Sequence, residues 1–293
     1  MILFFEPICL PKIWGGTRLN EVYQIKEKHI GECWGISAHK TYSTKVKHGE
    51  LQGVTLRELY QTHPHFFGYY NKDKFPILIK LIDAKEDLSI QVHPSDAYAL
   101  KHEDDFGKEE CWYILNADGE KILIGHNYNN KEMMQSAIEQ QKILEGMRYY
   151  PIKKHDYFYI PVGTVHAILN NTFLLEVSQS SDVTYRLFDY DRIDNLGNKR
   201  ELHIKQSLDV TNFPDQALIQ THQKKYFDFE IIKQDGLNTY DSDTYGDYLA
   251  VVEGSARIDQ QTCAFGDFMM VSSKTRYVIE GKITFARMRL IDY

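Results

Sequence analysis

Residues 89–93 alternate polar and apolar side chains, and this alternation restricts what the surrounding chain can form. On a β-strand, Ser89, Gln91 and His93 point to one face. Ile90 and Val92 point to the other face, which has to be buried. The pattern predicts a strand of a β-sheet whose polar face carries an amide and an imidazole.

Two further runs carry polar groups that complement this face. Lys108 and Glu110 are two residues apart and share a strand face, and His166 follows a turn at residues 161–163. If these faces line one cavity, two imidazoles, a carboxylate and the Gln91 amide surround one ion. Such donors suit Zn²⁺ and also fit Mn²⁺, Fe²⁺ or Co²⁺. A lone histidine is more often a surface or hydrogen-bonded core residue, but the polar partners favour ligation here.

Composition excludes several classes of protein. The 293 residues are 43% hydrophobic, which is enough for a sizeable core. A formal charge of −7, without a cluster of Lys and Arg, argues against a nucleic-acid-binding protein. The N-terminal residues show no basic leader or long apolar run, so neither export nor membrane insertion is expected. The oligomeric state stays open.

The cysteines carry a separate expectation. Cys9, Cys33, Cys111 and Cys263 are far apart and form no Cys-x-x-Cys pair. They predict neither a zinc ribbon nor a scaffold stapled by disulfides. Such cysteines suit a reducing compartment, so a cytoplasmic location is expected.

Short apolar runs between proline and glycine predict an all-β fold, a sandwich or barrel, with a few helices. Residues 75–82 form a nearly continuous apolar run, which is typical of a strand buried on both faces. Residues 11–16 hold too much proline and glycine for regular structure. They predict a packed loop anchored by Trp14.

Three segments have helical spacing instead. At residues 55–60, Thr55 is a plausible N-cap and Glu58 completes a capping box. Residues 131–147 are expected to form one amphipathic helix, and a short helix is expected around residues 205–209.

The expected division of the chain has three parts. A catalytic domain at residues 1–212 contains helical insertions at about 50–72 and 130–147. A linker at 213–225 leads to a smaller β-domain at 226–293. The last segment contains no histidine, so the metal centre is expected in the first domain.

Several of these runs resemble known signatures. Residues 161–170 are similar to the second cupin motif, and residues 91–110 to the first, with a widened gap before the glutamate. More narrowly, five runs resemble type I mannose-6-phosphate isomerase in its short bacterial form: residues 11–16, 89–94, 108–113, 163–168 and 185–192. The resemblance spans about residues 8 to 200. It implies a cupin, jelly-roll β-barrel catalytic domain and a smaller C-terminal domain of cupin type.

The resemblance also implies a ligand set. It implies that Gln91, His93, Glu110 and His166 hold one zinc ion. It further implies that Arg186 is catalytic.

Other positions are implied to contact the substrate or to move protons. Lys108 and Glu176 match positions for substrate contact or proton transfer. Asp182 and Ser89 match substrate-binding positions, with Ser89 near the phosphate. Two departures stand out, since His155 replaces the glycine of the general cupin motif and Glu176 is offset by one residue from longer members.

The residues themselves are compatible with this chemistry. An aldose–ketose isomerase moves a proton between adjacent carbons through an enediol, and a divalent metal with a fixed cation such as Arg186 stabilises the developing charge. Asp182, Thr184 and Arg186 share a strand face. The alternative for Arg186 is a surface ion pair. Lys108 either neutralises the phosphate or exchanges protons, while Glu176 is either a base or a buried hydrogen-bonded carboxylate.

The expected function is therefore interconversion of D-mannose 6-phosphate and D-fructose 6-phosphate by a zinc enzyme. A cupin oxygenase with a non-haem metal is one alternative, although it leaves Gln91, Lys108 and Arg186 without a role. A non-catalytic sugar-binding cupin is another. It would bind sugar phosphate without incorporating solvent deuterium at C2.

Overall fold

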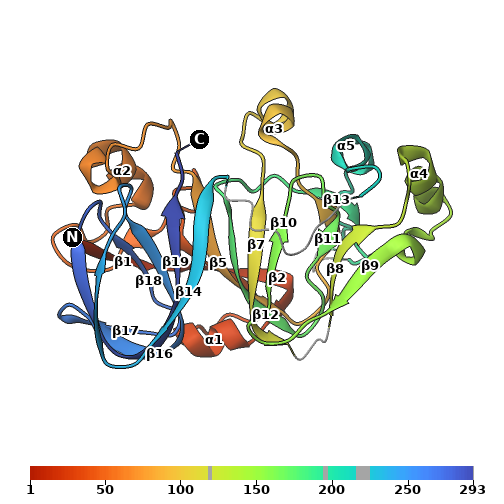
Figure 1. Cartoon of the computed structure of the whole chain (residues 1–293). Coiled ribbons are helices and arrows are strands. Elements are labelled where there is room, and N and C mark those ends of the chain that lie inside the picture. The colour runs from red at the N-terminus through yellow and green to blue at the C-terminus, as the bar shows by residue number, and fades with distance from the viewer. Residues whose placement is uncertain (118–120, 194–196, 216–224, 293) are drawn as a thin grey trace.

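The computed structural model describes residues 1–117, 121–193, 197–215 and 225–292, and β-strands dominate it (Figure 1). The first sheet has the order β10 (Tyr157–Ile160), β7 (Glu110–Ala117), β12 (Thr172–Gln179), β5 (Ile77–Ala84), β2 (Ile8–Gly16) and β3 (Ile30–Ile36). The second has the order β13 (Tyr185–Phe188), β6 (Ile90–Val92), β11 (His166–Ala167), β8 (Lys121–His126) and β9 (Met147–Pro151). We call them the six-stranded and the five-stranded sheet.

A third sheet is built largely from the C-terminal part of the chain. Its order is β14 (Phe227–Gln234), β19 (Arg276–Leu290), β16 (Asp247–Ile258), β18 (Phe268–Val271), β1 (Ile2–Glu6) and β4 (Lys45–Val46). β15 (Leu237–Asp241) pairs with β19, and β17 (Gln261–Ala264) pairs with β16. We call this the eight-stranded sheet. The expected β-rich fold class is confirmed.

The helices are short and lie at the edges of the sheets. In Figure 1, α2 (Leu56–Thr62), α3 (Asp96–His102), α4 (Lys131–Glu139) and α5 (Ile204–Val210) lie along the upper edge, and α1 (Arg18–Tyr23) lies below. Two 3-10 turns follow α2 and α4, at η1 (Pro64–Phe67) and η2 (Ile143–Gly146). No helix in the described ranges is long and apolar enough to cross a membrane.

The six-stranded sheet lies between two hydrophobic cores, and this explains the apolar run in β5. Ile77, Ile79 and Leu81 pack in a core shared with the eight-stranded sheet. Ile82 and Ala84 face the five-stranded sheet, where a second core includes residues of β8. Every residue of β5 is buried, so the prediction of a strand buried on both faces is confirmed.

The five-stranded sheet explains the alternation in residues 89–93. Ile90 and Val92 are fully buried in a core that also contains Met134 of α4 and Leu208 of α5. These helices therefore cover the outer face of the sheet. Gln91 points to the opposite face, toward the six-stranded sheet, as the alternation predicts.

The barrel expectation needs a correction. In the described residues, the strand pairings leave the six-stranded and five-stranded sheets separate, so the two sheets face each other without closing into one hydrogen-bonded barrel. Both sheets contribute residues to the core between them, including Trp112 from β7 and Ile124 from β8. The arrangement is an open, two-layered form of the expected jelly roll.

The segment predicted to be a loop is also different, because residues 11–16 belong to β2. The ladder between β2 and β3 is irregular on both sides of Pro11, where a proline without an N–H group is tolerated. A Cβ atom on Gly16 would lie 2.2 Å from Asp83 Oδ2, so glycine is required by close packing there. Trp14 is buried, as expected.

The helix predictions were partly right. The capping box of Thr55 and Glu58 is present at the start of α2, and the short helix near residue 205 is α5. The single helix expected at residues 131–147 is wrong, since α4 ends at Glu139 and the backbone of Gln141 has a positive φ of 60°. Helices α1 and α3 were not predicted.

One pair of cysteines also departs from expectation. Cys9 and Cys33 lie directly opposite each other in β2 and β3 and form a disulfide. Cys111 and Cys263 are free and buried. The expectation of a chain without disulfides is wrong for the first pair, because the residues are 24 positions apart and only the strand pairing brings them together.

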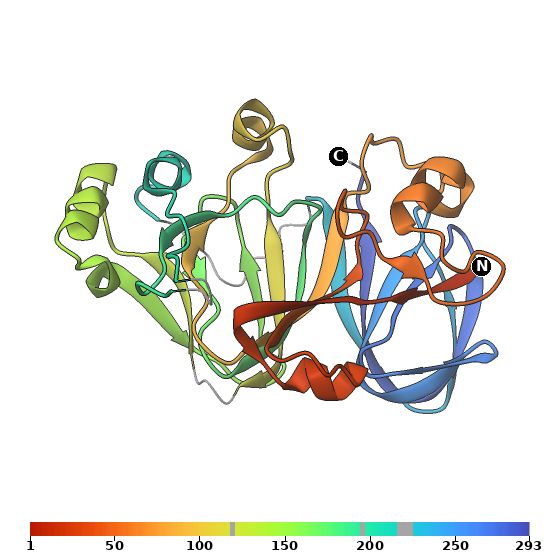
Figure 2. The same cartoon turned by 180° about the vertical axis from the view of Figure 1, so that it is seen from behind.

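The expected division into domains stays a prediction. That division did not include a connection that the strand pairing shows, in which N-terminal strands join the sheet of the C-terminal residues. β1 pairs with β18 and β4 pairs with β1, so two N-terminal strands complete the sheet of the C-terminal residues. Figure 2 shows this N-terminal segment, in red, running from the blue half of the molecule to the other half. Most of the linker expected at 213–225 lies outside the described residues.

The capping box gives a test of the fold. We expect Thr55→Ala to lower the free energy of unfolding by about 1 kcal/mol, because the backbone N–H of Glu58 loses its acceptor. Thr17→Ala is a matched control, since Thr17 precedes α1 without capping it through its side chain. Urea unfolding followed by circular dichroism measures both. Equal effects of the two substitutions would contradict the assigned cap.

Candidate metal centre

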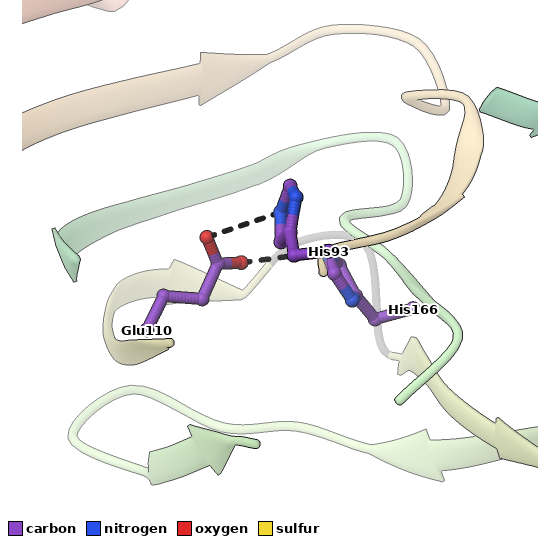
Figure 3. Close-up of side chains that lie close together, drawn as sticks. All are labelled: His93, Glu110 and His166. Carbon is purple, nitrogen blue, oxygen red and sulfur yellow. Dashed lines mark ion pairs between the residues drawn. The ribbon is translucent and has the colours of Figure 1, made fainter. Parts of the chain in front are cut away.

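Strands of two facing sheets bring His93, Glu110 and His166 together (Figure 3). Glu110 is the first residue of β7 in the six-stranded sheet, and His166 begins β11 in the five-stranded sheet. His93 directly follows β6, where Gln91 is paired with His166. The three predicted ligands with the strongest sequence signal therefore converge at one point between the sheets.

The distances between their donor atoms suit a metal ion. Nε2 of His93 lies 3.4 Å from Oε2 of Glu110, and Nε2 of His166 lies 3.4 Å from Oε1 of Glu110. All three ligand atoms lie within 4.8 Å of one another. A tetrahedral ion with bonds of 2.0–2.1 Å requires donors about 3.4 Å apart. The residues therefore fit a small divalent cation.

Hydrogen bonds to the backbone orient both imidazoles. Nδ1 of His93 donates to the carbonyl of Val183 at 2.8 Å, and Nδ1 of His166 donates to the carbonyl of Thr164 at 2.9 Å. Each ring thus turns Nε2 toward Glu110. Burial lowers the pKa of both histidines, and that of His166 falls to about 3. Both rings are neutral near pH 7, as metal ligation requires.

The Glu110 carboxylate is a buried charge with several partners. Burial opposes its charge, but the nearby Lys108 ammonium outweighs this and holds the pKa of Glu110 well below its usual value. Lys108 forms an ion pair with Oε2, and Nε1 of Trp112 donates to Oε1 at 3.0 Å. Burial likewise opposes the charge of Lys108, yet Glu110 and Glu176 raise its pKa. The expected shared face of Lys108 and Glu110 is present.

A row of charges extends from this centre across the six-stranded sheet. Glu176 in β12 lies opposite Lys80 in β5. Its Oε1 lies 3.2 Å from Nζ of Lys108 and 3.4 Å from Nζ of Lys80, and all three side chains are buried. The ammonium of Lys80 also lies 4.6 Å from the centre of the Trp34 ring. Positive and negative groups therefore alternate from Lys80 to Glu110.

Lys80 was missed by the sequence analysis, although a signal was present. It is the one charged residue of the apolar run at residues 75–82, and a charge in a strand buried on both faces needs a partner. Glu32 and Trp34 of β3 were missed as well. Burial opposes the charge of Glu32, but Lys80 and Lys12 outweigh it and lower its pKa to about 2.

Gln91 borders the metal centre with its amide group. Its Nε2 lies 3.3 Å from Nε2 of His166, and its Oε1 lies 3.3 Å from the hydroxyl of Ser89. In this orientation the amide nitrogen, rather than the oxygen that would bind a metal, faces His166. A half-turn of the amide would bring its oxygen to the same place, so the prediction of Gln91 as a ligand stays a prediction.

A cavity of about 320 Å³ opens beside the centre. Every predicted residue outside the His93–Glu110–His166 group lines it: Ser89, Gln91, Lys108, Glu176, Asp182 and Arg186. Four charged residues that the sequence did not single out line it too: Lys12, Glu32, Lys80 and Arg200. The walls therefore carry an excess of cations, which favours an anionic ligand.

Arg186 belongs to the cavity rather than to a surface ion pair. It lies opposite Gln91 in the pairing of β13 with β6. Burial lowers the pKa of its guanidinium, and Nε is buried without a hydrogen-bond partner. In the described part of the chain, no ion pair joins Arg186 to Asp182, Asp189 or Asp191. Asp189 is instead paired with two other arginines.

The departure at His155 has a local explanation. Its backbone has a positive φ of 77°, a conformation that favours glycine. Its Nδ1 is hydrogen-bonded to the hydroxyl of Tyr113 at 2.7 Å. His155 thus stands at the glycine position of the general motif and adopts the left-handed backbone conformation that suits glycine.

Comparisons with known proteins agree with the geometry. The sequence profile described as phosphomannose isomerase type I, catalytic domain, matches residues 3–143. A Bacillus subtilis protein named probable mannose-6-phosphate isomerase GmuF is 39% identical over 97% of both chains. The mannose-6-phosphate isomerase of Streptococcus mutans is 46% identical over 71% of this chain and 67% of its own length.

A solved structure extends the likeness to the whole fold. The crystal structure of the mannose 6-phosphate isomerase from Bacillus subtilis superposes with a TM-score of 0.93, at 33% identity and over 99% of each chain. The likeness covers the C-terminal sheet as well as the two sheets around the cavity.

The ligand geometry makes a direct prediction. We expect His93→Ala and Glu110→Gln to lose stoichiometric divalent metal, because each removes one of three donors, while the far-ultraviolet circular dichroism stays close to that of the parent. Metal analysis of the purified proteins measures this. His65→Ala, at an exposed histidine of η1, is the control. Full metal content in both ligand variants would contradict the assignment.

Proposed function

Because this chain belongs to the type I phosphomannose isomerase family, we propose that it interconverts D-mannose 6-phosphate and D-fructose 6-phosphate in the cavity beside His93, Glu110 and His166. The observation that carries the proposal is the convergence of these three donors next to a cavity lined with cations. A sugar phosphate brings both hydroxyl groups for a metal and an anion for the basic walls. We further propose that the protein works in the cytoplasm; the free thiols of Cys111 and Cys263 support a reducing compartment, whereas the Cys9–Cys33 disulfide does not.

Zinc is the proposed metal. His93, Glu110 and His166 would hold it, and Gln91, whose amide lies beside His166, is the candidate for a fourth ligand once a half-turn presents its oxygen. The ion would act as a Lewis acid on the oxygens of C1 and C2. Two imidazoles and one carboxylate are typical of zinc but do not exclude other divalent ions.

Arg186 and Lys108 are proposed to stabilise the negative charge of the enediol. Both cations line the cavity, and the guanidinium of Arg186 has a buried Nε without a hydrogen-bond partner. The raised pKa of Lys108 keeps its ammonium charged, which favours an electrostatic role over that of a base. Fixed cations in a cavity shielded from water stabilise such charge strongly.

Glu176 is then the proposed proton-transfer group. Its carboxylate lines the cavity, and Oε1 is buried next to the ammonium groups of Lys80 and Lys108 without an ideal hydrogen bond. It can accept the proton from one carbon and return it to the other. The two lysines hold the carboxylate in place, so Lys80 is proposed to orient it.

The phosphate is proposed to bind near Ser89. The Ser89 hydroxyl lines the cavity together with Arg200, which is held by Asp189 through Nε at 2.7 Å. Asp182, also in the wall, is proposed to accept hydrogen bonds from sugar hydroxyls.

A coupled assay tests the reaction. Mannose 6-phosphate should be converted to fructose 6-phosphate, a chelator should abolish turnover, and added Zn²⁺ should restore it. In D₂O, one deuterium should appear at C2 of the recovered substrate. Binding of sugar phosphate without deuterium incorporation would support a non-catalytic cupin instead, and oxygen uptake with bound iron would support an oxygenase.

Arg186→Ala tests the proposed cation. We expect kcat to fall by about 10²–10³-fold, because charge that develops on the enediol loses its fixed partner, while the metal content stays stoichiometric. Steady-state kinetics with mannose 6-phosphate and metal analysis measure this. Arg257→Ala, at an exposed arginine of β16, should be neutral. A fully active Arg186→Ala enzyme would remove the residue from the mechanism.

A further inference from the structure

His39 lies beside the cavity wall without a role in the proposed reaction. It belongs to the segment between β3 and β4, and its imidazole is buried with 8% exposure. Nε2 of His39 lies 3.3 Å from Oδ2 of Asp182, which belongs to the segment between β12 and β13. A residue from a distant part of the chain thus faces a carboxylate that lines the cavity.

The hydrogen bonding of the ring determines which nitrogen carries the proton. The backbone N–H of Thr41 donates to Nδ1 of His39 at 3.2 Å. In the neutral imidazole, Nδ1 is therefore the acceptor and Nε2 carries the hydrogen. Nε2 is buried, and its N–H makes no well-aligned hydrogen bond in the described residues, although Oδ2 of Asp182 lies 3.3 Å away. In the described residues, no other carboxylate lies within ion-pair distance of Nε2.

Two aromatic rings hold the imidazole in this position. Trp34 contacts it edge-on with ring centres 5.5 Å apart, and Tyr42 stacks on it at 6.1 Å. Trp34 and Tyr42 are themselves part of the cavity wall, but His39 is not. The ring is therefore placed behind the wall, and the wall carboxylate of Asp182 lies beside its Nε2.

Among the described residues, Asp182 has no lysine or arginine within ion-pair distance, unlike the other carboxylates of the wall, Glu32 and Glu176. The side chain of Asp182 is 51% exposed, whereas Glu176 is buried between two lysines. Lys40 and Lys80 contribute charge near Asp182, but neither is within ion-pair distance of it among the described residues. Oδ1 accepts no hydrogen bond in this part of the structure. One oxygen thus lies beside the buried N–H of His39, which has no other acceptor in the described residues, and the other is available to a ligand.

We propose that His39 is a positioning residue that fixes the carboxylate of Asp182 for hydrogen bonding to the hydroxyl groups of the sugar phosphate. The inference rests on the proposed function and deepens it. His39 itself does not touch the substrate. It acts through Asp182, so its loss affects how the sugar is held rather than whether the metal binds.

Asparagine and glutamine variants of His39 distinguish the contact made by Nδ1 from the contact made by Nε2. The amide of glutamine reaches about as far as Nε2 and can still donate to Asp182. The amide of asparagine reaches only as far as Nδ1, so it can keep the contact with Thr41 but loses the donor to Asp182. Both are polar and smaller than histidine, so both disturb the aromatic contacts to a similar degree.

The experiment measures kcat, KM and metal content of the metal-loaded enzyme with mannose 6-phosphate. We expect His39→Asn to lower kcat/KM by about 10–100-fold, as for other residues that orient a functional group, and His39→Gln to stay within about threefold of the parent. Both should bind stoichiometric metal. His65→Asn, at the exposed histidine of η1, should have no effect.

A double-mutant cycle makes the test specific to the pair. In an Asp182→Asn background, His39→Asn should cause little further loss, because its effect passes through that carboxylate. Full additivity, or equal losses for the glutamine and asparagine variants, would overturn the inference. So would a fully active His39→Asn enzyme. These outcomes leave the isomerase proposal intact, whereas an inactive parent enzyme would overturn the proposed function and this inference together.

Discussion

The neutralisation of one buried carboxylate is the constraint on which the rest of this structure depends. Glu110 is 1% exposed, and an isolated charge at such a place is strongly unfavourable. Lys108, Trp112 and two imidazoles surround it. Lys108 and Trp112 belong to the same segment as Glu110, whereas the imidazoles come from the end of β6 and from β11, so both sheets are tied to a single charge. A divalent cation would strengthen the same arrangement, because it adds positive charge where the donors already converge.

The two sheets around the cavity contribute different parts of the chemistry. The six-stranded sheet supplies Lys80, Glu176 and Glu110 from neighbouring strands, and Lys108, just before β7, lies between the two carboxylates. The five-stranded sheet supplies Gln91 and His166, which are directly paired. Since each sheet has its apolar reverse side buried in a separate core, the polar faces are held at a fixed separation. Rigid packing behind both walls therefore preorganises the site.

Much of the site was predictable from the sequence, because strand alternation is local information. Residues 89–93 and 108–110 show their polar faces without any knowledge of the partner strands, and the fold class followed from similar runs. Three features could not be predicted because they depend on pairing between distant segments. These are the disulfide of Cys9 and Cys33, the contact of His39 with Asp182, and the partners that allow Lys80 to be buried. The loop prediction at residues 11–16 failed for a related reason, since the pairing with β3 tolerates an irregularity at Pro11.

The pairing of β1 with β18 has a consequence for biosynthesis. Residues 2–6 leave the ribosome long before their partner strand, which ends at Val271. During translation, the edge of β1 that pairs with β18 stays uncovered until nearly the whole chain has been made. Contacts between such distant segments slow folding, and uncovered strand edges promote association with other chains. Strand β1 is thus a poor place for an insertion, because it lies between β18 and β4 inside a sheet that needs the C-terminal strands.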